Sequence, residues 1–105
     1  MEHIPDFGEA CTQIRRVLVP GGMHIFTIPV VTDRTTRKRA DVVGGDLIHR
    51  LSPSYHGPPG DISTDRLVFY EFGADVVRMI EACGFSLRHY QDSLNPALNT
   101  FATIK

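Results

Sequence analysis

The sequence has 105 residues and a mass of 11.7 kDa, which predicts one domain with a modest core, since such a chain buries roughly two-thirds of its unfolded surface. Its 11 Lys and Arg nearly balance 12 Asp and Glu, so a global field that attracts nucleic acid or acidic lipid is excluded. The sequence has neither the apolar run of a membrane span nor the layout of a secretion signal, so a soluble cytoplasmic protein is expected.

The first predicted element is an amphipathic helix over Asp6–Leu18. Asp6 can cap its N-terminus, and Glu9, three residues later, can complete a capping box. Apolar residues at three- and four-residue spacing predict one buried face: Phe7, Ala10, Cys11, Ile14, Val17 and Leu18. The Pro20–Gly22 break then ends the helix and reverses the chain.

A strand is predicted over Met23–Val30, which is mostly apolar on both faces. Parallel strands in the interior of a sheet have this composition because other elements cover both of their faces. A helix, a tight turn and a two-sided strand form half of a doubly wound α/β unit. The strand is therefore expected to run parallel within a sheet, close to the preceding helix.

Residues 31–65 predict a loop-rich insertion, because polar, glycine and proline residues interrupt any long regular structure. Such a segment is either a lid or binding loop, or disordered. Asp46–Leu51 within it can form a short helix or strand. The basic run Arg37–Arg39 either steers an anionic substrate or is merely solvated. Tyr55 and His56, beside a glycine, are either substrate contacts or incidental surface residues.

The last third of the chain predicts one more helix and two strands. Leu67–Phe72 is apolar and aromatic and leads into a helix over Gly73–Cys83. Strands are expected over Phe85–Gln91 and Thr100–Ile104, paired as an antiparallel hairpin. The predicted fold class is α/β, in the order helix, strand, insertion, helix, strand, strand.

Neither the cysteines nor the histidines show the spacing of a metal site. Cys11 and Cys83 fall on apolar helix faces and belong to no C-x-x-C pair, so they are expected to be buried and reduced. The five histidines show no H-x3-H spacing, which gives a metal site little support.

Glu2 and His3 come just before the first helix. Ligands bind outside the carboxyl ends of parallel strands, so these residues would lie on the ligand-binding rim if a strand preceded them. The alternative is a frayed, polar N-terminus.

Three segments resemble an S-adenosylmethionine-dependent methyltransferase with the Rossmann-like fold: Glu2–Asp6, Ile14–Gly22 and Ile25–Pro29. In that family an E-H-(I/L)-x-D segment is followed by a helix, an R-V-L-K-P-G-G turn and a strand. The stretch Leu67–Gly73, the Ala82–Phe85 helix end and the terminal antiparallel pair fit as well. The resemblance implies that the chain is the C-terminal part of a methyltransferase domain.

The resemblance also implies roles for individual residues. Glu2 and His3 match the segment that approaches the methionine part of the cofactor, and His3 is the candidate for a catalytic base or acceptor-orienting group. Arg39, Tyr55 and His56 lie where such enzymes place recognition elements for the methyl acceptor, here a small molecule or a glycan-type group. The glycine-rich turn that holds most of the cofactor in this family is missing from the sequence.

Two hypotheses follow from this missing half. The chain is either a portion of a methyltransferase that begins at an internal methionine, or a non-catalytic remnant or module of that fold. A partial sheet leaves one strand edge unpaired, which would allow a homodimer to form. Nucleic-acid binding through Arg34–Arg39 is disfavoured, because interleaved aromatic residues and net basicity are lacking.

Overall fold

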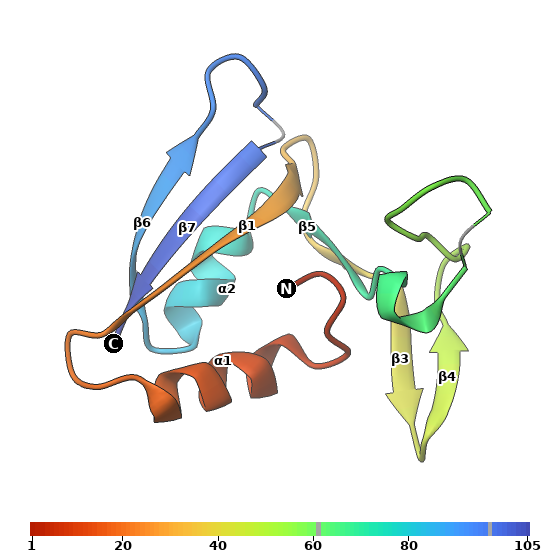
Figure 1. Cartoon of the computed structure of the whole chain (residues 1–105), viewed down its shortest axis with the longest axis horizontal. Coiled ribbons are helices and arrows are strands. Elements are labelled where there is room, and N and C mark those ends of the chain that lie inside the picture. The colour runs from red at the N-terminus through yellow and green to blue at the C-terminus, as the bar shows by residue number, and fades with distance from the viewer. Residues whose placement is uncertain (61, 97) are drawn as a thin grey trace.

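The computed structural model describes residues 1–60, 62–96 and 98–105, which form a mixed α/β fold (Figure 1). Residue 61 of the predicted insertion and residue 97 of the predicted last turn lie outside this description. The helical elements are α1 (Phe7–Val17), a 3-10 turn (Thr64–Arg66) and α2 (Val76–Ala82). The strands are β1 (Met23–Val31), β2 (Arg37–Lys38), β3 (Ala40–Val43), β4 (Asp46–His49), β5 (Tyr70–Gly73), β6 (Ser86–Gln91) and β7 (Leu98–Ile104).

Helix α1 begins and ends close to where the sequence predicts. The carboxylate of Asp6 accepts a hydrogen bond from the Glu9 amide at 2.9 Å, which confirms the N-cap. The second half of the capping box is wrong, since the Glu9 carboxylate accepts a 2.7 Å hydrogen bond from the Gln13 side chain instead. Gly21 then takes a φ of 74°, and this left-handed residue turns the chain into β1.

Five strands form one mixed sheet in the order β2-β5-β1-β7-β6. Strand β1 pairs antiparallel with β7 along nearly its whole length, from Met23 opposite Ile104 to Pro29 opposite Leu98. Its parallel pairing with β5 covers only Val30 and Val31, so the prediction that this strand runs parallel within the sheet is wrong for most of its length. The predicted antiparallel pair at the C-terminus is confirmed, with β6 alongside β7.

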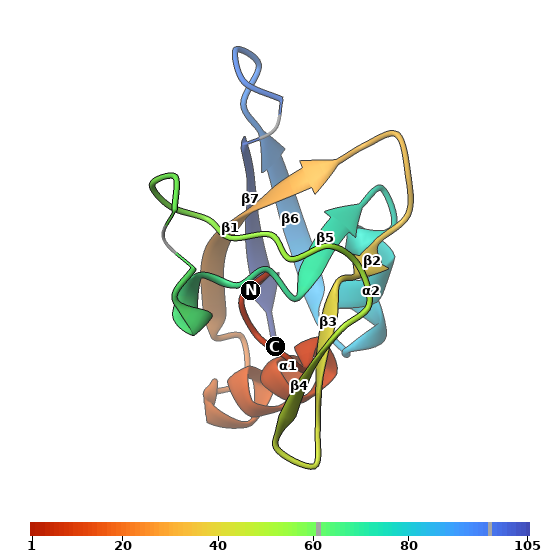
Figure 2. The same cartoon turned by 90° about the vertical axis from the view of Figure 1, so that its right-hand side faces the viewer.

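The prediction that β1 is covered on two sides is wrong. One face of β1 is buried, and its Ile28 is only 2% exposed. The other face is open to solvent, where Met23 is 48% and Ile25 63% exposed. Both helices pack on the same face of the sheet, and the two views show α2 behind the strands of Figure 1 (Figures 1 and 2).

The main core lies between the two helices and the inner face of the sheet. It contains residues from both helices and from three strands: Phe7, Cys11, Ile28, Phe72, Val76, Ile80, Phe85 and Phe101. Cys11 is buried and Cys83 half-buried, and both are free thiols, as expected. Burial, followed by a hydrogen bond with Cys83, raises the pKa of the Cys11 thiol to about 12, which keeps it protonated and unreactive.

The predicted insertion contains more regular structure than expected. Strands β3 and β4 form a hairpin that projects from the main sheet (Figure 1), joined by Gly44 and Gly45. Their φ values of 62° and 93° suit the tight two-residue turn that connects twisted antiparallel strands. A second small core of Ala40, Leu67 and Phe69 anchors the insertion to β5. The prediction of a mainly loop segment is therefore corrected to short strands joined by turns.

Helix α2 begins later than predicted, at Val76 rather than Gly73. Gly73 ends strand β5, because its parallel pairing with Val31 continues to that residue. Asp75 precedes the helix without capping it, and its carboxylate accepts hydrogen bonds from the amide and hydroxyl of Thr36, both at 2.7 Å. This contact ties the loop after β1 to the start of α2.

Candidate functional site

Glu2 is anchored in the fold rather than frayed. Its carbonyl accepts hydrogen bonds from the amides of Phe69 and Tyr70, at 2.7 and 3.2 Å, and its side chain is nearly buried. The alternative of a solvated polar N-terminus is therefore wrong. These backbone contacts hold Glu2 and His3 against the segment that enters β5.

The structure brings Glu2 and His3 together with His56, which lies far away in the sequence. Oε1 of Glu2 is 3.7 Å from Nε2 of His3 and 3.5 Å from Nδ1 of His56. The two imidazole rings meet edge to face, with centroids 4.9 Å apart. One carboxylate oxygen thus faces both histidines, in a group named below the Glu2–His3–His56 cluster.

The hydrogen bonds of His3 determine which of its nitrogens carries a lone pair. Nδ1 lies 2.9 Å from the carbonyl oxygen of Leu67, which can only accept a hydrogen bond. In the neutral tautomer that this contact selects, the proton is on Nδ1, and Nε2 is the ring nitrogen that faces Glu2. Such an arrangement suits a base or a metal ligand.

Glu2 keeps its charge in this position. Burial by itself would raise the pKa of its carboxyl group. The hydrogen bond from its own backbone amide, the ammonium group of Met1 and the positive charge that His3 carries when protonated outweigh that effect and hold the pKa below its ordinary value. Glu2 therefore presents a carboxylate to both histidines at neutral pH.

His56 also lines a pocket of about 160 Å³ beside the cluster. The walls come from the ends of β1 and β5 and from the insertion: Pro29, Val31, Arg39, Ser54, His56, Val68, Tyr70, Glu71 and Phe72. The parallel strands β1 and β5 both end here, at Val31 and Gly73. The pocket therefore lies at the sheet edge where ligands of α/β proteins usually bind.

Arg39, a predicted acceptor-binding residue, lines the same pocket as His56. Its Nη1 is 2.9 Å from Oε2 of Glu71, and its Nη2 donates to the carbonyl of Ser52 at 2.7 Å. Its Nε is buried and has no hydrogen-bond partner among the described residues. The guanidinium is thus fixed in place with one donor left over.

The basic run is not simply solvated, because its side chains form ion pairs with carboxylates of the same chain, and its role toward a substrate stays a prediction. Arg37 and Arg34 also approach Glu71, at 2.5 and 3.5 Å, while Lys38 forms an ion pair with Asp41. Hydrogen bonding from Arg37, followed by the charges of Arg37, Arg39 and Arg34, lowers the pKa of Glu71 despite partial burial. The run is therefore neutralised by carboxylates of the same chain.

Tyr55 is the one predicted site residue that the structure keeps out of this arrangement. Its side chain packs against the small core of Ala40, Leu67 and Phe69, and its backbone forms an isolated bridge with Leu67. Because neighbouring residues in extended chain point to opposite sides, Tyr55 faces this core while His56 faces Glu2. Tyr55 supports the loop that carries His56.

Arg39 and His56 are the predicted site residues that line this pocket, and among the lining residues that were not predicted are Tyr70 and Glu71. Both belong to β5, a segment that the sequence predicts to be apolar and aromatic but not specifically a strand. The signal for Glu71 is its position as a lone carboxylate in an aromatic run, since a charge there requires a partner.

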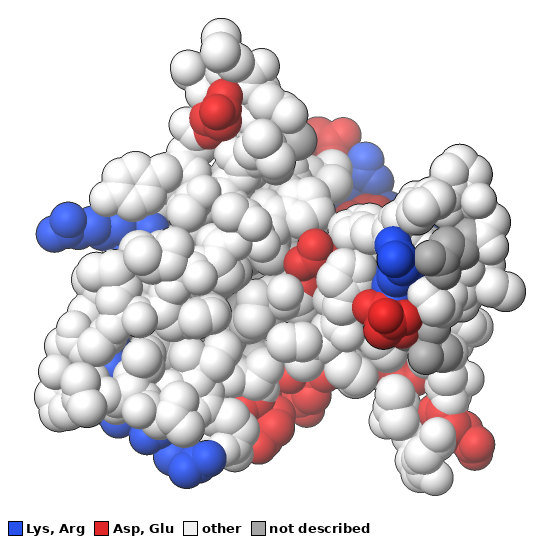
Figure 3. Space-filling view, in the orientation of Figure 1, with Lys and Arg blue, Asp and Glu red and all other residues white. Residues whose placement is uncertain are grey.

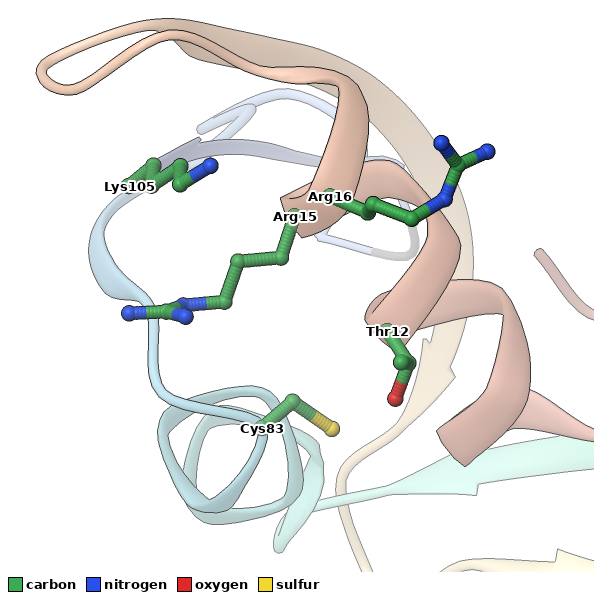
Figure 4. A pocket seen from close by; sticks show the side chains of 5 residues that line it. All are labelled: Thr12, Arg15, Arg16, Cys83 and Lys105. Atoms are coloured by element: carbon green, nitrogen blue, oxygen red, sulfur yellow. The ribbon is translucent and has the colours of Figure 1, made fainter.

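A second hollow, of about 340 Å³, lies between the C-terminal ends of α1 and α2 (Figure 4). Arg15 donates to the carbonyl of Gly84 at 3.2 Å, and Lys105 to that of Leu18 at 2.6 Å. Figure 4 shows Arg16 pointing away from Arg15 and Lys105. Arg15 and Lys105 satisfy backbone carbonyls near the helix ends, and none of the predicted site residues lies here.

Comparison with protein-family models, curated proteins and solved structures finds no match to this chain. Within the described residues, no helix has the length and apolar character needed to span a membrane. The face of the sheet that Figure 3 presents is largely uncharged over β1, β7 and β6.

Proposed function

We propose that the chain supplies the acceptor side of an S-adenosylmethionine-dependent methyltransferase with a Rossmann-like fold, acting on a small-molecule or glycan-type acceptor. The observation that carries the proposal is the convergence of Glu2, His3, His56 and Arg39 beside one pocket. The sequence resemblance gives these residues related roles although they come from separate segments. Their proximity in the folded chain is what a common site requires.

The chemistry of methyl transfer makes modest demands on the protein. S-adenosylmethionine supplies the methyl group, and the protein must position the acceptor, exclude water and give the acceptor proton a path to leave. In this proposal His3 orients the acceptor or takes its proton at Nε2, since Nδ1 is engaged with Leu67. Arg39 offers its buried Nε to an oxygen of the acceptor.

Cofactor binding by this chain alone is expected to be weak. Glu2 and His3 would contact the methionine part of the cofactor, but the sequence has no glycine-rich turn to hold the rest. Isothermal titration of the 105-residue chain with S-adenosylmethionine tests this expectation. Micromolar affinity would contradict it and would place the main binding contacts within these residues.

The proposal itself is tested on the reading frame that contains this chain. An in-frame upstream stretch with a glycine-rich turn supports it, and transfer of a labelled methyl group by the complete protein is then expected. His3→Ala should lower turnover, while His49→Ala, an exposed histidine on β4, should leave it unchanged. A stop codon or unrelated upstream sequence would favour the non-catalytic remnant, and unchanged turnover in His3→Ala would remove His3 from the site.

Self-association through a sheet edge belongs to the same proposal. Within the described residues, Met23–Pro29 of β1 pair with β7 on one side only, since β5 reaches no further than Val30. An unpaired backbone edge of this length is a template for a strand of a second copy. Sedimentation velocity over a range of concentrations would reveal a dimer, and a constant monomer mass would exclude it.

A further inference from the structure

The Glu2–His3–His56 cluster places three metal-ligating groups around a common centre. One ring nitrogen of His3, one of His56 and a carboxylate oxygen of Glu2 all lie within 4.8 Å of one another. Zinc bonds of about 2.0–2.1 Å at tetrahedral angles set ligand atoms about 3.4 Å apart. The distances of 3.5 and 3.7 Å from Glu2 to the two histidines are close to that spacing.

The contacts of His3 leave one of its ring nitrogens facing Glu2. Nδ1 of His3 is engaged with the carbonyl oxygen of Leu67, so Nε2 is the ring nitrogen that lies 3.7 Å from Oε1 of Glu2. A lone pair facing a carboxylate oxygen is repulsive unless a proton or a metal ion lies between them. The group is also partly withdrawn from water, since Glu2 is buried and the side chains of His3 and His56 are 32% and 46% exposed.

We propose that Glu2, His3 and His56 bind a divalent transition-metal ion, with Zn²⁺ as the best-fitting occupant. Two imidazole nitrogens and one carboxylate suit zinc, whereas magnesium and calcium prefer oxygen ligands throughout. The hydrogen bond from Nδ1 of His3 to the Leu67 carbonyl is the outer contact that usually orients a metal-bound histidine. The site is independent of the proposed methyl transfer.

Three protein ligands leave a fourth position on a tetrahedral ion, which is the arrangement of catalytic rather than structural zinc sites. His56 belongs both to the cluster and to the wall of the 160 Å³ pocket. An acceptor oxygen in that pocket could therefore take the fourth position. This last step rests on the proposed function, and it makes His3 an acceptor-orienting residue, since a metal-bound Nε2 cannot accept a proton.

Metal binding is tested on the 105-residue chain after treatment with a chelator. Isothermal titration with ZnCl₂ should show one equivalent bound with micromolar or tighter affinity, and the melting temperature should rise with zinc. His3→Ala, His56→Ala and Glu2→Gln should each weaken binding at least tenfold. The matched control His49→Ala, on the exposed hairpin, should bind as the parent does.

Cobalt substitution separates this site from the cysteines. Bound Co²⁺ should give visible bands of a nitrogen- and oxygen-ligated ion without thiolate charge transfer, and Cys83→Ser should leave the spectrum unchanged. Circular dichroism checks that each variant is folded, and His56→Ala, on a half-exposed loop, remains informative if Glu2→Gln unfolds. Absence of zinc binding, or equal affinity in His56→Ala, would overturn the proposal, whatever the methyl-transfer assay shows.

Discussion

Gly73 lies where the backbone of the insertion approaches strand β5 so closely that a larger residue does not fit. A Cβ atom added at Gly73 would overlap the backbone of Arg34, Thr35 and Thr36. The backbone of these residues cannot move away from the added atom, whereas the end of a flexible side chain could. The amide of Gly73 donates a hydrogen bond to the Thr36 hydroxyl at 3.0 Å, which also holds these two backbone segments together.

Gly73→Ala is therefore expected to lower the free energy of unfolding by about 1–3 kcal/mol or more, as overpacked positions do. Gly8→Ala is the matched control, since its added Cβ would meet only Asp6 Oδ1, at an ordinary 3.5 Å. A helical glycine replaced by alanine should stabilise by roughly 0.5–1 kcal/mol. Urea unfolding of both variants measures the difference, and equal stability would contradict the close approach at Gly73.

At the same scale, the sequence identifies most of the candidate site but not its geometry. The residue types at Glu2, His3, Arg39 and His56 are chemically suited to a site, and the structure brings them together. Nothing in the sequence distinguishes Tyr55 from its neighbour, because which side each faces depends on how the loop packs against Leu67. Histidine spacing also misses the cluster, since its members come from separate segments.

Helix α1 is the element whose limits follow most directly from its sequence. Asp6→Ala removes the hydrogen bond to the Glu9 amide and should cost about 0.5–2 kcal/mol of stability. Glu9→Gln should change stability by less than about 0.5 kcal/mol, because the Glu9 side chain makes only an exposed contact with Gln13. Thermal unfolding of the two variants tests this order, and a larger loss of stability in Glu9→Gln than in Asp6→Ala would contradict it.

The strands within 31–65 are the elements that sequence analysis describes least well. The pair Gly44–Gly45 between two apolar runs is a hairpin signal that the prediction of a loop-rich segment does not use, and a tight turn forms there. Strand β2 has only two residues, Arg37 and Lys38, and exists because it pairs with β5. No local pattern predicts so short a strand, since its stability comes from its partner.

At the scale of the whole molecule, the apolar pattern of β1 predicts a strand but not its surroundings. The apolar residues on both faces of Met23–Val30 predict two covering layers, whereas both helices pack on one face. The parallel contact between β1 and β5 joins segments on either side of the insertion, so no local period can predict it. The α/β class, both helices and the terminal strand pair were predictable because each depends on nearby residues.

Carboxylates at three points fasten the insertion and its flanks to the rest of the molecule. The pKa of Glu71 is lowered mainly by a hydrogen bond from Arg37. Hydrogen bonds from Lys38 and Arg50 lower the pKa of Asp41 in the same way. The pKa of Asp75 is lowered mainly by a hydrogen bond from Thr36. Each carboxyl therefore binds a proton less readily in the folded chain than in the unfolded chain. Their stabilising contribution is complete above the ordinary pKa values of 3.8 and 4.5 and is lost as pH falls through the lower folded values.

Acid should therefore destabilise the whole molecule. The free energy of unfolding should be nearly constant from pH 7 to 5 and should fall steeply below about pH 4.5. Glu71→Gln should be less stable at pH 7, because it leaves Arg34, Arg37 and Arg39 without their shared carboxylate. Its stability should also fall less between pH 5 and 3 than that of the parent chain. Glu81→Gln, an exposed residue of α2, should keep the parent's profile. Urea midpoints across this pH range measure the slopes, and an unchanged slope in Glu71→Gln would show that Glu71 does not contribute to acid sensitivity.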